Sequence, residues 1–226
     1  MRQKDKKQKK SAFIRSMETA AIMAVMFACA LPVLSSCSKK EPSSKTPDVI
    51  QDQGQNKFLT LKQHLQQKPD DAEAWYDMAD LYYQNSLFGK AAEAYKKAAK
   101  LDPEGYTYLK LGMSYDAINQ PRQAAAAYEQ AVKLMPSYAV AYNNLGAAYG
   151  KLGKSGKEIA AFEKAIKLRS HYATARYNLG YAYLKKGDKR SAMKQYEALE
   201  NIDQGMAENL IEKIKSPKSL SAAAGQ

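Results

Sequence analysis

Apolar residues recur along most of the chain with the spacing of one helical face. In the first half of each repeating segment they lie at i, i+3, i+4 and i+7, which is the spacing of an amphipathic α-helix. Gly153 and Gly187 stand where such helices have to end, a position suited to a left-handed residue, and Asn119 can take the same role. The pattern predicts an all-α fold of short helices.

These stripes repeat every 33 or 34 residues. Pro69, Pro103 and Pro136 are 34 and 33 residues apart, and Ser170 lies 34 residues beyond Pro136. A period of this length signals a solenoid, in which each repeat buries its apolar face against its neighbours. Registration on these positions gives four copies, over residues 69–103, 104–136, 137–170 and 171–204.

The same residue types occupy the same places in the registered copies. They are an aromatic residue at the fourth position, Leu-Gly at the seventh and eighth, Tyr at the eleventh, Ala at the twentieth and an aromatic residue at the twenty-fourth. This set resembles the tetratricopeptide repeat, whose unit is a helix-turn-helix. The resemblance covers residues 70–204 and implies a right-handed superhelical solenoid of four repeats.

Two residues depart from the repeat. We expect Gly or Ala at the eighth position to let the first helix approach the small residue at the twentieth. Glu158 replaces that small residue in the third copy, so either its carboxylate reaches solvent at the edge or the turn between Gly153 and Gly156 shifts register. Arg176 replaces the aromatic residue in the fourth copy; it either packs its stem on the edge or binds a partner's carboxylate.

Both ends of a solenoid need a covering helix. An apolar stripe predicts an N-terminal capping helix over residues 57–68, and another predicts a C-terminal one over 205–215, followed by a tail over 216–226. The residues of the two stripes are Phe58, Leu61 and Leu65, and Met206, Leu210 and Ile214.

The first 36 residues have the pattern of a bacterial secretory signal. A basic segment over residues 1–19 precedes an apolar run from Ala20 to Leu34, which at ~1.5 Å per residue is too short for the ~30 Å hydrocarbon core. Leu34, Ser35, Ser36 and Cys37 then resemble the lipobox of bacterial lipoproteins. An uncleaved membrane helix, or an ordinary signal with a chance cysteine, stays open as an alternative.

The lipobox resemblance implies cleavage before Cys37. It also implies a diacylglyceryl group on the thiol and a further acyl chain, such as palmitate, on the new amine; several chains make a stable anchor. Residues 37–56, rich in Pro, Ser, Lys and Gln, would form a flexible tether. We expect a lipid-anchored, periplasm-facing protein of the bacterial envelope, and Ser38 favours the outer membrane over the inner.

Composition argues against catalysis. Both cysteines lie in the first 40 residues, and His64 and His171 are the only histidines, so we expect no enzyme, no metal and no cofactor. The formal net charge is +12, and the first 36 residues contribute seven basic and two acidic residues to it. The remaining lysines are spread over many helices, which predicts a solvated basic surface and no nucleic-acid partner.

The resemblance implies that a partner binds on the concave face, which the first helix of each repeat lines. That groove would run from acidic and aromatic, through small, to basic and aromatic residues. Asn144 and Asn178 occupy the place where family members hold a peptide backbone, although Asn-Leu-Gly is also the repeat consensus. The candidate partner-binding residues are Tyr76, Asp80, Tyr83, Asn143, Asn144, Lys151, Arg176, Tyr177, Asn178, Tyr181 and Lys185.

Together these features predict a membrane-anchored adaptor or scaffold that binds an envelope protein or peptide. Two alternatives stay open: a pilotin-like assembly factor for a pilus or secretin, and a homo-oligomeric scaffold for cell-wall enzymes.

The anchor hypothesis is tested by Cys37→Ala. We expect the variant to move from the membrane to the soluble fraction of native envelopes, because the thiol that carries the lipid is gone. Fractionation followed by immunoblotting measures this, with Cys29→Ala as the matched control that stays in the membrane. Equal membrane association of both variants would show that Cys37 is not the anchor.

Overall fold

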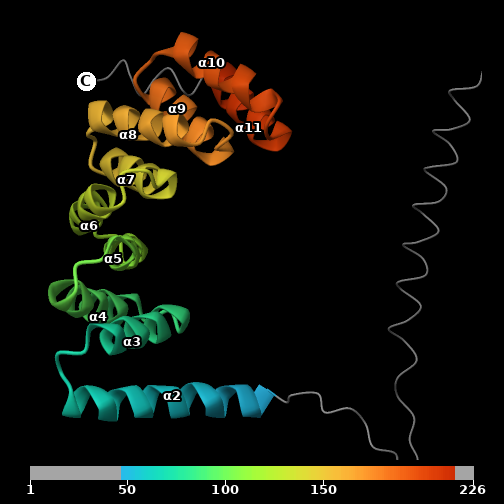
Figure 1. Ribbon diagram of the computed structural model, residues 1–226. Coiled ribbons are helices and arrows are strands. Elements are labelled where there is room, and N and C mark those ends of the chain that lie inside the picture. Colours follow the sequence, from blue (N-terminus) through green and yellow to red (C-terminus); the bar gives the residue numbers. More distant parts are fainter. Residues whose placement is uncertain (1–46, 217–226) are drawn as a thin grey trace, which may run out of the picture. The chain divides into compact units, whose positions relative to one another are not determined.

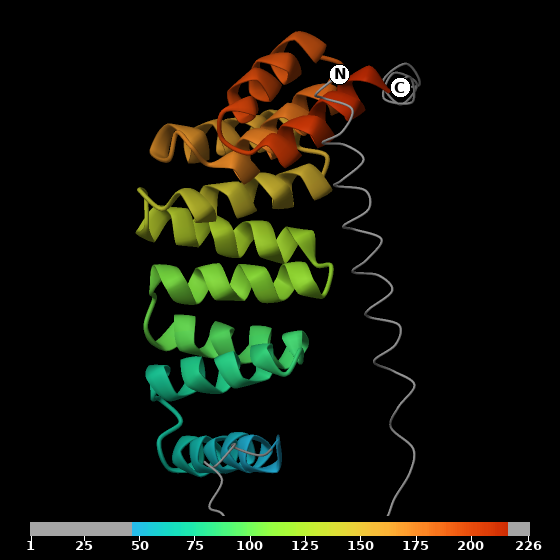
Figure 2. The same ribbon diagram turned by 90° about the vertical axis from the view of Figure 1, so that its right-hand side faces the viewer.

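The computed structural model describes residues 47–216, and its helices stack in chain order from α2 to α11 (Figure 1). This part of the chain contains no strand, and each helix packs against the next. The predicted all-α solenoid is confirmed, with pairs of helices forming successive layers (Figure 2). The helices are α2 (Pro47–Gln67), α3 (Ala72–Gln84), α4 (Phe88–Leu101), α5 (Gly105–Ala117), α6 (Pro121–Leu134), α7 (Ala139–Lys151), α8 (Ser155–Leu168), α9 (Ala173–Lys185), α10 (Lys189–Glu200) and α11 (Gln204–Lys215).

The N-terminal capping helix is longer than predicted. It begins at Pro47 rather than at residue 57, so the prediction of a flexible tether is wrong for residues 47–56. Proline suits the first helical position because its fixed φ is already helical and its missing N–H has no partner there. The predicted signal peptide, Cys37 and the tail beyond residue 216 lie outside the described residues.

The turn between the two helices of every repeat contains one residue in the left-handed conformation. Asn119, Gly153 and Gly187 have φ of 55°, 70° and 82°, as predicted, and Ser86 takes the same place in the first repeat with φ of 59°. The next residue donates its backbone N–H to the carbonyl five positions back, for example Lys154 to Tyr149 at 3.0 Å. This bond satisfies a carbonyl at the helix end and fixes the direction of the second helix.

An aromatic ring lies on the bare backbone of the first helix inside repeats 2 and 3. A Cβ added to Gly112 would lie 2.5 Å from Cε1 of Tyr128, and one added to Gly146 would lie 2.7 Å from Cε1 of Phe162. The glycine therefore makes its closest approach to the ring at the twenty-fourth position. Ala124, the small residue at the twentieth position of repeat 2, is fully buried as well.

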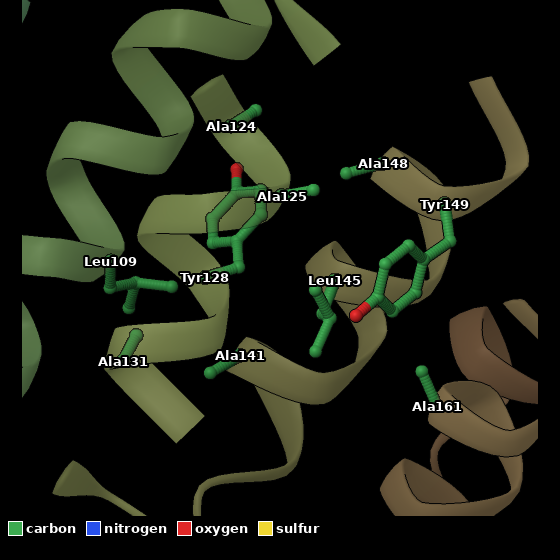
Figure 3. Close-up of a cluster of buried hydrophobic side chains, with 10 residues drawn as sticks. All are labelled: Leu109, Ala124, Ala125, Tyr128, Ala131, Ala141, Leu145, Ala148, Tyr149 and Ala161. Atoms are coloured by element: carbon green, nitrogen blue, oxygen red, sulfur yellow. The ribbon is translucent and has the colours of Figure 1, made fainter. Parts of the chain in front are cut away.

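Neighbouring repeats share their cores. Leu109 and Tyr128 lie on adjacent helices of one buried cluster, to which Leu145 and Tyr149 of the next repeat also belong (Figure 3). Tyr149 also donates its hydroxyl to Glu129 of the preceding repeat at 2.6 Å. Burial, followed by that hydrogen bond, raises the pKa of Tyr149 to about 12.

The ends of the stack are covered as predicted. Phe58 and Leu61 pack with buried Leu65 against the first repeat, and Leu210 and Ile214 are buried against the last. Among residues 47–216, no helix combines the length and the apolarity that crossing a bilayer requires.

The ring-on-backbone contact predicts opposite effects for two glycine substitutions. Gly112→Ala should lower the free energy of unfolding by about 1–3 kcal/mol, because the new methyl group overlaps the buried Tyr128 ring. Gly89→Ala in α4 meets no atom within 4 Å, so it should leave that free energy unchanged or raise it by up to about 1 kcal/mol. Urea denaturation measures both values. Equal destabilisation would mean that the contact does not set the helix spacing.

Candidate partner-binding groove

Four of the predicted site residues meet at one pocket between repeats 3 and 4. The pocket measures about 290 Å³, and Lys151, Asn178, Tyr181 and Lys185 contribute its polar and aromatic lining. They come from α7 and α9, the first helices of their repeats. The remaining lining residues are Ala147, Gly150, Glu158 and Phe162.

Glu158 stays buried at this pocket and is only 4% exposed. Its Oε1 lies 2.6 Å from Nζ of Lys185 in the next repeat. Gly150 makes the necessary room, because a Cβ there would lie 2.5 Å from the same oxygen. Both sequence-based alternatives for Glu158 are wrong: the carboxylate does not reach solvent, and α8 begins at the same repeat position as α4 and α6.

A carboxylate–lysine pair crosses every interface between consecutive repeats. In each pair the carboxylate belongs to one repeat and the lysine to the next. The three lysines are 33–46% exposed. The pairs of Asp80 and Asp116 are partly hydrated and contribute little to stability, whereas the Glu158 carboxylate is only 6% exposed and depends on its lysine. The pairs are Asp80–Lys110 at 3.3 Å, Asp116–Lys151 at 2.9 Å and Glu158–Lys185 at 2.6 Å.

Two buried tyrosines donate hydrogen bonds to the carboxylates of the first two pairs. Tyr95 donates its hydroxyl to Asp80, and Tyr128 donates to Asp116 at 3.1 Å. Burial is the largest cause that raises the pKa of both hydroxyls, and the neighbouring carboxylate adds to it. Both tyrosines therefore remain protonated donors.

The predicted asparagines hydrogen-bond to one another. Asn178 donates to Oδ1 of Asn143 at 3.1 Å, and Asn143 donates to Oδ1 of Asn144 at 3.3 Å. Asn143 is only 7% exposed, so its amide joins repeats 3 and 4 rather than facing a partner. Asn178 keeps its carbonyl and one N–H without a partner among the described residues, and it lines the pocket.

Arg176 hydrogen-bonds to other residues of the chain. Its Nε donates to the carbonyl of Ser170 at 2.9 Å, and Nη1 donates to Gln195 at 3.3 Å. Trp75 makes the same bond at the equivalent place in the first repeat, from Nε1 to the carbonyl of Pro69 at 2.9 Å. The arginine thus replaces the indole as a donor, and the structure favours packing over carboxylate binding.

The side chains of three further predicted residues contact other side chains of the protein. Tyr177 donates its hydroxyl to Asn209 of the capping helix α11 at 2.8 Å. Tyr83 packs edge-on against Phe88 with ring centroids 5.1 Å apart. Tyr76 packs edge-on against buried Tyr95 at 5.5 Å, and burial, followed by Asp80, raises the pKa of Tyr76.

A second pocket, between repeats 1 and 2, was largely missed by sequence reasoning. It measures about 470 Å³, and Tyr76 is its only lining residue among the predicted site residues. Glu73 and Tyr106 have repeat positions that face the concave groove, whereas Asp102 and Glu104 lie at and just beyond the end of α4, in the connection to α5. The other lining residues are Ala72, Ala98 and Thr107.

Family comparisons identify the repeat. A "TPR repeat" model matches residues 112–153 and 159–187, and three "Tetratricopeptide repeat" models match residues 60–106, 139–172 and 174–202. Together these matches span more than half of the 226 residues. The chain is a tetratricopeptide-repeat protein. No curated protein sequence matches this TPR chain.

Solved structures agree with that assignment. MamA is 25% identical with a TM-score of 0.64, over 74% of this chain and 99% of its own. YrrB, described as a TPR protein with an unusual peptide-binding site, is 19% identical with a TM-score of 0.67, over 72% and 86%. PilW, described as a type IV pilus biogenesis factor, is 19% identical with a TM-score of 0.60, over 78% and 83%. YrrB and PilW bear on the fold alone.

The TPR chain has the architecture of a protein-binding scaffold, a family generally without enzymatic activity.

The buried Glu158–Lys185 pair predicts that removing the lysine alone costs more stability than removing both partners. Lys185→Met should lower the free energy of unfolding by about 1–3 kcal/mol, because it leaves the Glu158 carboxylate buried without its partner. Combining it with Glu158→Ala should recover most of that loss, since Ala occupies this position in the other repeats.

Lys151→Met is the matched control, because its partner Asp116 is 21% exposed and stays partly hydrated. We expect a loss of at most about 1 kcal/mol for this variant in urea denaturation. A double variant as unstable as Lys185→Met would contradict the interpretation of the buried pair.

Proposed function

We propose that this TPR protein is a membrane-tethered adaptor of the bacterial envelope. Its groove holds an extended segment of a protein partner, with an anionic group of that segment in the pocket between repeats 3 and 4. The observation that carries the proposal is the convergence of Lys151, Asn178, Tyr181 and Lys185 on that pocket.

The pocket offers donors for a carboxylate. The side chains of Lys151 and Lys185 are 46% and 40% exposed, and the carboxylates beneath them are 21% and 6% exposed. Each ammonium group has three donors, and the paired carboxylate occupies one of them, so the others can bind a ligand. Charge-assisted hydrogen bonds from two lysines would favour binding of an aspartate, a glutamate or a C-terminal carboxylate over a neutral group.

The same pocket offers surface for the rest of the segment. Tyr181 is 46% exposed, and Nζ of Lys185 and Nζ of Lys213 lie 5.8 Å and 5.9 Å from its ring centroid. An exposed tyrosine can bury a large apolar area while its hydroxyl stays hydrated. The unpaired carbonyl and N–H of Asn178 suit the backbone of an extended chain.

The cellular location is proposed from the N-terminal sequence. The basic segment, the apolar run and the lipobox-like Leu34-Ser35-Ser36-Cys37 support secretion and a lipid anchor at Cys37. An adaptor on such an anchor would meet its partner at the membrane surface, the outer membrane being favoured. Pilus or secretin assembly and a homo-oligomeric scaffold remain narrower alternatives, which the described residues do not favour.

Site-directed crosslinking in native envelopes tests the groove. Asn178→Ala combined with Tyr181→Ala should reduce the yield of the crosslinked partner about tenfold, because both side chains contact it in the pocket. Lys186→Ala with Lys194→Ala is the matched control, since both lysines are exposed on the same repeat outside the pocket. Circular dichroism checks that helicity is intact. Equal crosslinking of both double variants would overturn the groove assignment.

A further inference from the structure

The C-terminal capping helix α11 takes the place that the first helix of a further repeat would have. It begins at Gln204, about one repeat length after α9 begins at Ala173. It packs on α10 and α9, just as α9 packs on α8 and α7 (Figure 1). Because α7 and α9 line the pocket between repeats 3 and 4, a helix that packs on α9 in this way extends the same surface.

Two contacts join α11 to the groove side of α9. Tyr177 donates its hydroxyl to Asn209 at 2.8 Å. One turn further along both helices, Nζ of Lys213 lies 5.9 Å from the ring centroid of Tyr181. Residues four apart lie on the same face of a helix, so Asn209 and Lys213 both face α9. Since Tyr181 lines the pocket and is 46% exposed, Lys213 lies at the rim of that pocket.

The two lysines inside the pocket have their charge offset by carboxylates. Lys151 lies 2.9 Å from Asp116, and Lys185 lies 2.6 Å from Glu158. Both ammonium groups keep N–H groups for hydrogen bonds, but each pair carries no net charge. A partner's carboxylate would therefore gain donors from these lysines and little long-range attraction.

Lys213 differs from them, because it forms no ion pair with another described residue. The residue one turn before it on the same face is the neutral Asn209. The acidic residues of α11, Glu208 and Glu212, are exposed and make no ion pair with it. The ring of Tyr181 attracts an ammonium group but has no net charge, so the charge of Lys213 is not offset there.

Tyr181 also brings the two kinds of lysine together. Its ring centroid lies 5.8 Å from Nζ of Lys185 and 5.9 Å from Nζ of Lys213. A carboxylate beside this ring could accept charge-assisted hydrogen bonds from both ammonium groups. The exposed ring would cover the apolar part of the residue that carries the carboxylate.

We propose that Lys213 of the capping helix sets the preference of the groove for an anionic group. The carboxylate of the partner segment lies at Tyr181, between Lys185 and Lys213, and Asn178 binds the backbone beside it. This inference rests on the proposed function for its protein partner, whereas the choice of a carboxylate at this place rests on the charges. The groove therefore ends at α11, and the helix that caps the core is also part of the binding site.

Titration with small carboxylates tests this site directly. Nα-acetyl-glutamate amide, added to the full chain in detergent, should shift the NMR signals of the Tyr181 ring. We expect Nα-acetyl-glutamine amide, which has nearly the same shape without the charge, to bind about threefold more weakly. Nα-acetyl-alanine and its amide make the same comparison for a terminal carboxylate. Preference for either acid supports the proposal and identifies the source of the carboxylate, whereas equal binding of both acids and their amides would overturn it.

A single charge locates the preference. Lys213→Gln should weaken binding of the preferred acid about threefold, and Lys213→Arg should restore it, because arginine keeps the charge. Lys215→Gln is the matched control, since this exposed lysine is two residues away and does not share the face of Lys213. Circular dichroism checks that α11 is intact. Acid binding by the Lys213→Gln variant that equals the control would reject Lys213 as the source of the preference.

The two proposals fail in different experiments. Lost crosslinking of the Asn178→Ala/Tyr181→Ala variant, together with normal acid binding by Lys213→Gln, would keep the groove and reject this inference. Weaker acid binding by Lys213→Gln, together with unchanged crosslinking of the double variant, would keep Lys213 as the anion-binding residue and reject the pocket as the partner site.

Discussion

The arrangement of the two central repeats depends on the packing of an aromatic ring against a helix backbone that lacks a side chain. Tyr128 lies on Gly112 and Phe162 lies on Gly146, each at a distance that a Cβ would forbid. This contact sets the separation of the two helices of a repeat, and the left-handed residue between them sets their direction. The left-handed residue recurs in all four repeats and the ring–glycine contact in repeats 2 and 3, so the two helices of a repeat keep a similar arrangement from one repeat to the next.

Charged side chains are arranged regularly along the groove. Each repeat interface places a carboxylate of one repeat beside a lysine of the next, and buried tyrosine hydroxyls hold two of these carboxylates in place. The pocket between repeats 1 and 2 is acidic and aromatic, and the one between repeats 3 and 4 is basic and aromatic. The acidic end and the lysine-bearing end that the first-helix residues predicted are therefore both present in the groove.

Sequence reasoning found half of the residues that line the pocket between repeats 3 and 4. Lys151, Asn178, Tyr181 and Lys185 were placed on one face by their repeat positions, and the structure brings them to one pocket. Arg176 and Tyr177 occupy repeat positions on the first helix like the others, but contact Gln195 and Asn209 of later helices. Asp102 and Glu104 were missed because the expected site was restricted to first helices, whereas these residues lie at and after the end of a second helix.

The sequence by itself determined the repeat, its helices and its turns, because these depend on interactions within a few residues. Helical spacing, the left-handed turn residue and the apolar caps are all readable over one or two turns of chain. Only the tertiary structure decided how Glu158 is accommodated, since its partner Lys185 is 27 residues away and the space comes from Gly150. It also decided that Tyr177 is covered by α11, 32 residues further along. Such pairings depend on how the helices stack, and the spacing of residues along one helix does not specify them.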